Sequence, residues 1–140
     1  MQINRGNNFT TAYATYTDQE NGKLQPETKR MWVSALRSGN YPQTLGRLKR
    51  GDAYCCLGVL CEIDPMVHYL PEGYLYEGGN SSGTLPSNYA NYLGISTEGR
   101  FHYTFSVAGV TYVDYTSLVV LNDDLKLNFK QIADVINYFF

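Results

Sequence analysis

The chain has 140 residues with a formal charge of −2 at pH 7, and only 17% of its residues are charged while 13 are tyrosines. This length fits one folded domain, 1–140, and the low charge excludes a disordered acidic chain. A pI near 5.6 argues against a general duplex-DNA binder, which must neutralise phosphates. The sequence contains neither an apolar run of membrane-spanning length nor the apolar stretch of a signal peptide, so we expect a cytosolic protein with reduced thiols.

The first predicted elements are a strand and a helix. Residues 9–17 are rich in Thr and Tyr, which indicates an edge strand, and Asn21-Gly22 marks a turn. A proline at the first helical position and Gly39 after the last turn delimit a helix over 26–38. Its predicted buried stripe consists of Met31, Trp32, Ala35 and Leu36.

A loop over 40–44 and a short hairpin over 45–54, turning at 50–52, are predicted next. The apolar run Cys55 to Ile63 fits a buried strand or a buried helix, because periodicity does not separate the two in so short a segment. We favour a short helix that ends at Asp64-Pro65.

Residues 66–86 are dense in Gly, Tyr and Ser, which predicts either a long functional loop or a strand followed by a flexible connector. A short helix over 86–93 follows. The alternating residues 101–107 and the segment 110–114, joined by Ala108-Gly109, are typical of a β-hairpin.

The C-terminal part is predicted to be helical. Thr116 or Ser117 caps a short helix through Leu121, although Val119-Val120 would also suit a strand. Asn128 and Gln131 have the spacing of a capping box at the start of the last helix. The apolar face of that helix consists of Phe129, Ile132, Ala133, Ile136 and Phe139. The predicted fold class is α+β, a small antiparallel sheet packed by three or four short helices.

Few residues suggest catalysis or metal binding. Cys55, Cys56 and Cys61 lack metal-ligand spacing, and their apolar surroundings favour core thiols over a nucleophile paired with His68 or His102. The pair Asp123-Asp124 fits a connection between helices better than a catalytic dyad, and one of the two could instead pair with an Arg of the basic segment. We therefore predict no catalytic residue, no cofactor and no metal.

Basic and aromatic residues concentrate in one stretch. Six of the eleven Lys and Arg residues lie between Lys29 and Arg50. Four of them are predicted to contact phosphate, and two tyrosines of the stretch are placed to stack on a base. These candidate ligand-binding residues are Arg37, Tyr41, Arg47, Lys49, Arg50 and Tyr54. The alternative is a solvated charged face, with Trp32 as a core anchor of the first helix.

Several phrases of the sequence resemble a known group of proteins. They are W-x-x-ALRSG-x-Y-x-Q from Trp32, G-x-L from Gly46, YCCLGVLC from Tyr54, LP from Leu85 with YLGI from Tyr92, and LND from Leu121 with F-x-x-IAD-x-I from Phe129. Together they are similar to a family of small proteins encoded by tailed bacteriophages and prophages. The resemblance implies a phage origin and a location in the host cytoplasm.

The resemblance leads to a functional expectation. Small accessory phage proteins without catalytic motifs often act by binding, and some sequester nucleotide signals of host immunity. We expect a non-catalytic, homo-oligomeric protein that sequesters such a small nucleotide-type ligand, with neither membrane nor duplex nucleic acid as a partner. One alternative is an interaction module that inhibits a host enzyme through the Tyr-rich segment 66–84. A small hydrolase acting on the same signals is a third possibility.

Overall fold

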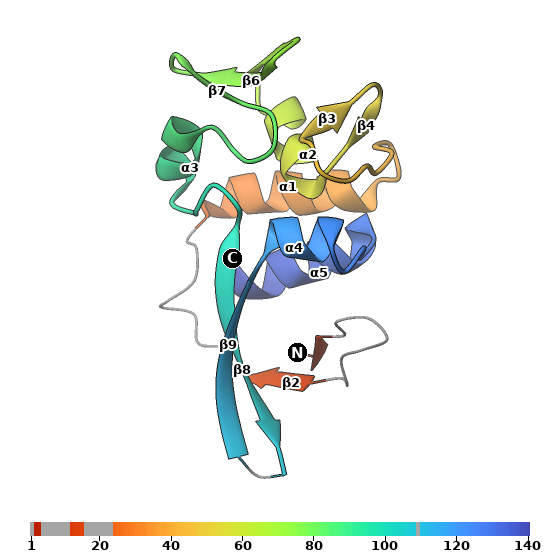
Figure 1. Cartoon of the computed structure of the whole chain (residues 1–140), viewed down its shortest axis with the longest axis vertical. Coiled ribbons are helices and arrows are strands. Elements are labelled where there is room, and N and C mark those ends of the chain that lie inside the picture. The colour runs from red at the N-terminus through yellow and green to blue at the C-terminus, as the bar shows by residue number, and fades with distance from the viewer. Residues whose placement is uncertain (1, 4–11, 16–23, 109) are drawn as a thin grey trace.

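The computed structural model describes residues 2–3, 12–15, 24–108 and 110–140 (Figure 1). They form five helices and three small antiparallel sheets, which confirms the α+β class, although the helices outnumber the three or four predicted. The helices are α1 (Pro26–Arg37), α2 (Cys56–Ile63), α3 (Ser87–Leu93), α4 (Leu118–Asp123) and α5 (Phe129–Phe139). The strands are β1 (Gln2–Ile3), β2 (Ala12–Thr15), β3 (Lys49–Arg50), β4 (Ala53–Tyr54), β5 (His68–Leu70), β6 (Gly73–Tyr76), β7 (Gly79–Ser81), β8 (Arg100–Val107) and β9 (Val110–Ser117). The turn predicted at 21–22 lies outside the described residues.

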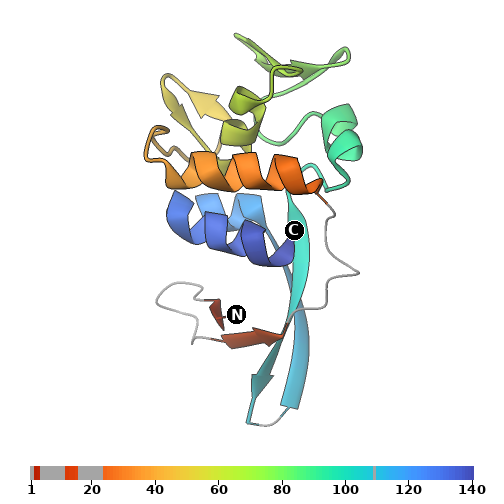
Figure 2. The ribbon, with the colours of Figure 1, turned by 180° about the vertical axis from the view of Figure 1, so that it is seen from behind.

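Helix α1 crosses the middle of the molecule and packs against α5 and α2 (Figures 1 and 2). It begins at Pro26 and is followed by Gly39 with a φ of 79°, as predicted. Its predicted stripe is wrong at Met31, which is exposed, whereas Val33 is buried. Helices α2 and α5 cover a face that contains Trp32, Val33 and Leu36, and this face is rotated about the helix axis relative to the predicted stripe, which leaves Met31 outside it.

The run 55–63 is helical, as favoured from the sequence. The Cys55 thiol accepts a hydrogen bond from the backbone N–H of Gly58 and caps α2. The Trp32 indole N–H donates to the carbonyl of Cys56 at 2.9 Å, which fixes α2 on α1. The three cysteines are free and buried, as expected for core thiols.

The long hairpin of β8 and β9 belongs to a four-stranded sheet with the order β1-β2-β8-β9. One end of this hairpin leads into α4, and the other end projects away from the helices (Figures 1 and 2). Strand β2 pairs with β1 on one side and with β8 on the other. The strand predicted within 9–17 is therefore present, but the prediction that it lies at a sheet edge is wrong.

The segment 66–86 is more regular than predicted. Strands β5, β6 and β7 form a meander, in which Glu77 and Gly78 make a tight turn with φ values of 48° and 81°. Tyr74 and Tyr76 point inward from β6 and are buried. The prediction of a loop or flexible connector fails because alternate tyrosines of a Gly-rich stretch pack into the core.

The two C-terminal helices begin at side-chain caps. The Ser117 hydroxyl accepts the N–H of Val120 at 3.1 Å, so the segment after β9 is the predicted helix and not the alternative strand. Asn128 and Gln131 form both hydrogen bonds of the capping box, each 2.9 Å long. The predicted apolar face of α5 is buried, with Val135 in addition.

Candidate functional site

The residues predicted to bind a ligand lie in two separate places. Arg37 is at the end of α1, where its guanidinium donates to the Asp134 carboxylate of α5 at 2.7 Å. The other five lie in or next to the β3–β4 hairpin. The suggested pairing of Asp123 or Asp124 with an Arg of the basic segment is not found among the described residues: Arg37 pairs with Asp134 instead, and Asp123 accepts the backbone N–H of Gly46 at 3.0 Å.

At the hairpin, Lys49 and Tyr54 point toward an acidic residue of α2. The Lys49 ammonium lies 3.1 Å from the Glu62 carboxylate, and the Tyr54 hydroxyl donates to the same oxygen at 2.9 Å. The ammonium also lies 4.3 Å from the ring centre of Tyr69. Burial acts to lower the pKa of Lys49, but the hydrogen bond to Glu62 opposes it and the pKa is raised overall. A phosphate here would have to displace Glu62.

The two predicted stacking residues contact each other. The rings of Tyr41 and Tyr54 meet edge to face, with centres 5.5 Å apart. Arg47 and Arg50 are exposed, and neither pairs with an acid in the part of the chain that the structure describes. Arg47 lines a cavity of about 10 Å³, which holds no more than one water molecule. The predicted residues do not converge on one ligand-sized site.

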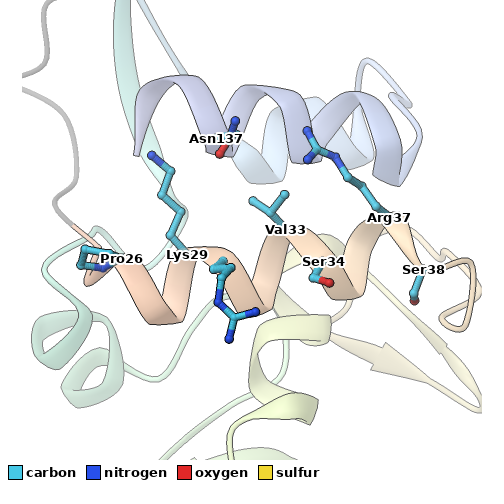
Figure 3. Close-up of a pocket in the computed structure, with 8 residues that line it drawn as sticks. Pro26, Lys29, Val33, Ser34, Arg37, Ser38 and Asn137 are labelled. Carbon is cyan, nitrogen blue, oxygen red and sulfur yellow. The ribbon is translucent and has the colours of Figure 1, made fainter.

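A larger concave surface lies between α1 and α5 (Figure 3). This α1–α5 groove is open, has a volume of about 630 Å³ and is lined by Pro26, Lys29, Arg30, Val33, Ser34, Arg37, Ser38 and Asn137. The side chains of Lys29 and Arg37 both extend toward α5, on either side of Asn137 (Figure 3). Since they are two turns apart on α1, their backbones are about 12 Å apart along the helix axis.

Three of the lining residues are cations, and none of the described residues that line the groove is acidic. Arg30 pairs with Glu27 one turn earlier, and Arg37 pairs with Asp134; both pairs are largely exposed. Lys29 has no acidic partner among the described residues. Lys29 and Arg30 belong to the basic stretch of the sequence but are not among the residues predicted to bind a ligand. The helical spacing of Lys29, Val33 and Arg37 is the signal that could have grouped them.

A second groove lies where the β8–β9 hairpin meets α4. It has a volume of about 490 Å³ and is lined by Glu98, Arg100, Tyr115, Thr116, Ser117 and Val120. None of these residues was predicted to bind a ligand. The hairpin register, in which Arg100 is opposite Ser117, is the sequence signal that could have joined them.

The residues that carry the phage resemblance are mainly structural. The Gln43 amide donates to the Asn122 side chain and to the carbonyl of Leu127, both at 2.8 Å. Asn122 is fully buried and donates to the carbonyl of Thr44 and to Asp123. This network fastens the loop before β3 to α4.

The buried thiols are poor nucleophiles. Burial raises the pKa of Cys55 to about 11, and it raises the pKa values of Cys56 and Cys61 well above their ordinary value. Within the described residues, no group of three or more His, Cys, Asp or Glu side chains is placed to hold a metal ion. No helix among them is both long enough and apolar enough to span a membrane.

Comparison with known proteins identifies a family. The model of a family described as "Domain of unknown function (DUF8296)" matches residues 24–140. No curated protein and no solved structure matches the chain. The match starts just before α1 and includes both grooves.

Proposed function

This chain belongs to the DUF8296 family, and we propose that it is a non-catalytic phage protein that sequesters a small nucleotide-type signal of host immunity. Its α1–α5 groove binds the phosphates of that ligand. The observation that carries the proposal is the cluster of Lys29, Arg30 and Arg37 around an open groove, in which no described lining residue carries a carboxylate. Host cytoplasm and a homo-oligomeric state are part of the proposal.

The groove cations remain available to a ligand although two of them are paired. The Arg37 and Asp134 side chains are 45% and 63% exposed, and exposed pairs contribute at most about 1 kcal/mol. A phosphate carries more charge than a carboxylate and accepts the guanidinium fork with two oxygens. It therefore competes well for Arg37, while Lys29 binds a second anionic group without losing a partner.

Sequestration fits the groove better than turnover does. The lining residues that the structure describes include Ser34 and Ser38 but no His, Asp, Glu or Cys that could act as a general base. The three thiols lie in the core. The nearby carboxylates of Glu27 and Asp134 are held by Arg30 and Arg37, which makes either a weak base toward a bound phosphate ester.

Calorimetric titration of the full chain with cyclic dinucleotides and ADP-ribose derivatives tests the proposal. We expect binding to one class of these ligands, and chromatography should recover that ligand unchanged. The Lys29→Ala/Arg37→Ala variant should lose at least about tenfold in affinity, whereas the control variant Arg47→Ala/Arg50→Ala should retain it. Loss of affinity in the control alone would move the site to the hairpin. No binding to any member of the panel, or product formation, would overturn sequestration.

The homo-oligomeric state needs a separate measurement. Light scattering coupled to gel filtration gives the mass directly, which we expect to be a multiple of 15.8 kDa. A mass of one chain at every concentration and with ligand present would remove this part of the proposal.

An interaction module is the second candidate, because large apolar side chains are exposed near the β5–β7 sheet. Met66, Tyr69 and Tyr92 are 51%, 46% and 63% exposed, and the Tyr92 ring packs on that of Tyr76 in β6. Host lysate passed over the immobilised chain distinguishes the two functions. One stoichiometric protein partner that is lost in a Tyr69→Ser/Tyr92→Ser variant would favour this candidate.

A further inference from the structure

The groove between the β8–β9 hairpin and α4 has the features of a second binding site. Two of the elements that line it, β9 and α4, are in front in Figure 1, whereas α1 and α5 are in front in Figure 2. Paired strands form one wall, and α4 contributes the half-buried apolar side chain of Val120. Five of its six lining residues are therefore on regular elements, and Glu98 lies in the turn before β8.

Arg100 supplies a cation to this groove. Its backbone N–H donates to the Ser96 hydroxyl at 2.7 Å, which fixes the start of β8. The side chain is exposed and pairs with no acid in the described part of the chain. An anionic group can thus bind the guanidinium without displacing a protein carboxylate.

The Tyr115 ring contacts a neighbouring ring and is still largely exposed to solvent. The His102 ring lies against it with centres 5.7 Å apart, while 65% of Tyr115 remains exposed. A tyrosine ring in such a position can stack on a planar ligand, and base–aromatic stacking contributes about 1–3 kcal/mol.

Glu98 further defines what the ligand must offer, because its carboxylate lines the groove and can accept N–H groups. The Thr116 hydroxyl is buried, but Thr116 is paired with Phe101 and lies on the other face of the hairpin from Tyr115 and Arg100, so it is not placed to meet a ligand that stacks on Tyr115. Ser117 contributes less, because its hydroxyl already accepts the N–H of Val120.

We propose that this groove binds a planar ring that carries N–H donors and an anionic substituent, the chemistry of a purine nucleotide. Arg100 binds the anionic group, Tyr115 stacks on the ring and Glu98 accepts its N–H groups. The site is independent of the α1–α5 groove, because neither groove shares a lining residue with the other.

Titration of the ¹⁵N-labelled full chain with guanosine 5′-monophosphate, followed by amide chemical shifts, tests this site. The largest shifts should lie in 98–101 and 115–120. Arg100→Ala and Tyr115→Ala should each weaken binding about tenfold, whereas Tyr115→Phe, which keeps the ring, should stay within about twofold. Arg50→Ala, which changes a residue that lines neither groove, is the control and should leave the shifts in 98–101 and 115–120 unchanged.

Three outcomes would overturn the second site. They are the absence of shifts at millimolar nucleotide, shifts confined to the α1–α5 groove, and an affinity that is unchanged in Arg100→Ala. Guanosine and inorganic phosphate serve as half-ligands, and each should bind more weakly than the nucleotide. If guanosine alone binds as tightly as the nucleotide, the anionic contact to Arg100 is refuted.

Discussion

Lys29 and Lys49 carry the same ammonium group in opposite settings. Lys49 belongs to β3, and its ammonium lies 3.1 Å from the Glu62 carboxylate of α2 and 4.3 Å from the ring centre of Tyr69. Lys29 lies at the α1–α5 groove, where Asn137 and Val33 are its neighbours in the lining and none of the described carboxylates pairs with it. One lysine connects two parts of the fold, and the other remains available to a ligand.

Whether a basic side chain can bind a ligand depends on which carboxylates the fold places next to it. Lys49 and Glu62 are separated by 13 residues, and Arg37 and Asp134 by 97. If this contrast is correct, substitutions at or near Lys49 change the free energy of unfolding, and substitutions at or near Lys29 change the affinity for the phosphate ligand.

The largest effect should come from Gly58, which lets the Leu48 backbone, next to Lys49, approach α2. A Cβ at Gly58 would be 1.7 Å from the carbonyl oxygen of Leu48. We expect Gly58→Ala to lower the free energy of unfolding by about 3 kcal/mol or more, because backbone cannot yield as a side chain does. Urea denaturation measures this. Gly83→Ala is the control, since nothing lies within 4 Å of a Cβ there, and equal stability of both variants would contradict the close approach.

Alkaline pH should lower the free energy of unfolding through Cys55, the residue that caps α2. Its pKa is raised from 9.0 to about 11, so between these pH values the unfolded chain releases the thiol proton and the folded chain keeps it. The free energy of unfolding therefore falls as pH rises, by roughly 2–3 kcal/mol for this group. Cys55→Ser keeps a side-chain acceptor at the cap and should reduce the slope. Urea titrations from pH 8 to about 11 compare the two proteins, and identical slopes would refute this contribution.

Features set by neighbouring residues could be predicted from the sequence. Pro26 begins α1, and Asn128 with Gln131 caps α5, because these signals act within one turn of helix. The β8–β9 hairpin follows from alternation around one turn. The β5–β7 meander was missed because its Gly-rich composition resembles a loop, while the burial of Tyr74 depends on tertiary packing.

The candidate site could be predicted only in part, because a run of basic residues carries no information on their partners. Lys49 and Tyr54 were expected to contact a ligand, but Glu62 comes from another element and binds both. Arg37 is the one predicted residue that lines the α1–α5 groove. Asn137, which lines the groove from the last helix, could not be predicted because nothing in the sequence around α1 indicates that α5 packs there.

The pair of Lys49 and Glu62 should contribute a moderate amount. Its side chains are 17% and 30% exposed, so removing one charge leaves the other partly desolvated. We expect Lys49→Met and Glu62→Gln each to lower the free energy of unfolding by about 1–2 kcal/mol, with a coupling near 1 kcal/mol in the double-mutant cycle. Lys29→Met is the matched control and should change stability little. A coupling energy of zero would mean that the ion pair of Lys49 does not stabilise the fold and that Lys49, like Lys29, is available to a ligand.

The smallest effect on stability should come from Asp134→Asn. This variant tests whether the cations of the α1–α5 groove bind the ligand. The exposed pair with Arg37 contributes less than about 1 kcal/mol, so the free energy of unfolding should change little. Affinity for the phosphate ligand should instead rise several-fold, because Arg37 no longer exchanges a carboxylate for the ligand. Calorimetry on Asp134→Asn and on the double variant Asp134→Asn/Arg37→Gln separates the two effects. If the gain persists without Arg37, it comes from the general loss of a negative charge and not from the release of that guanidinium.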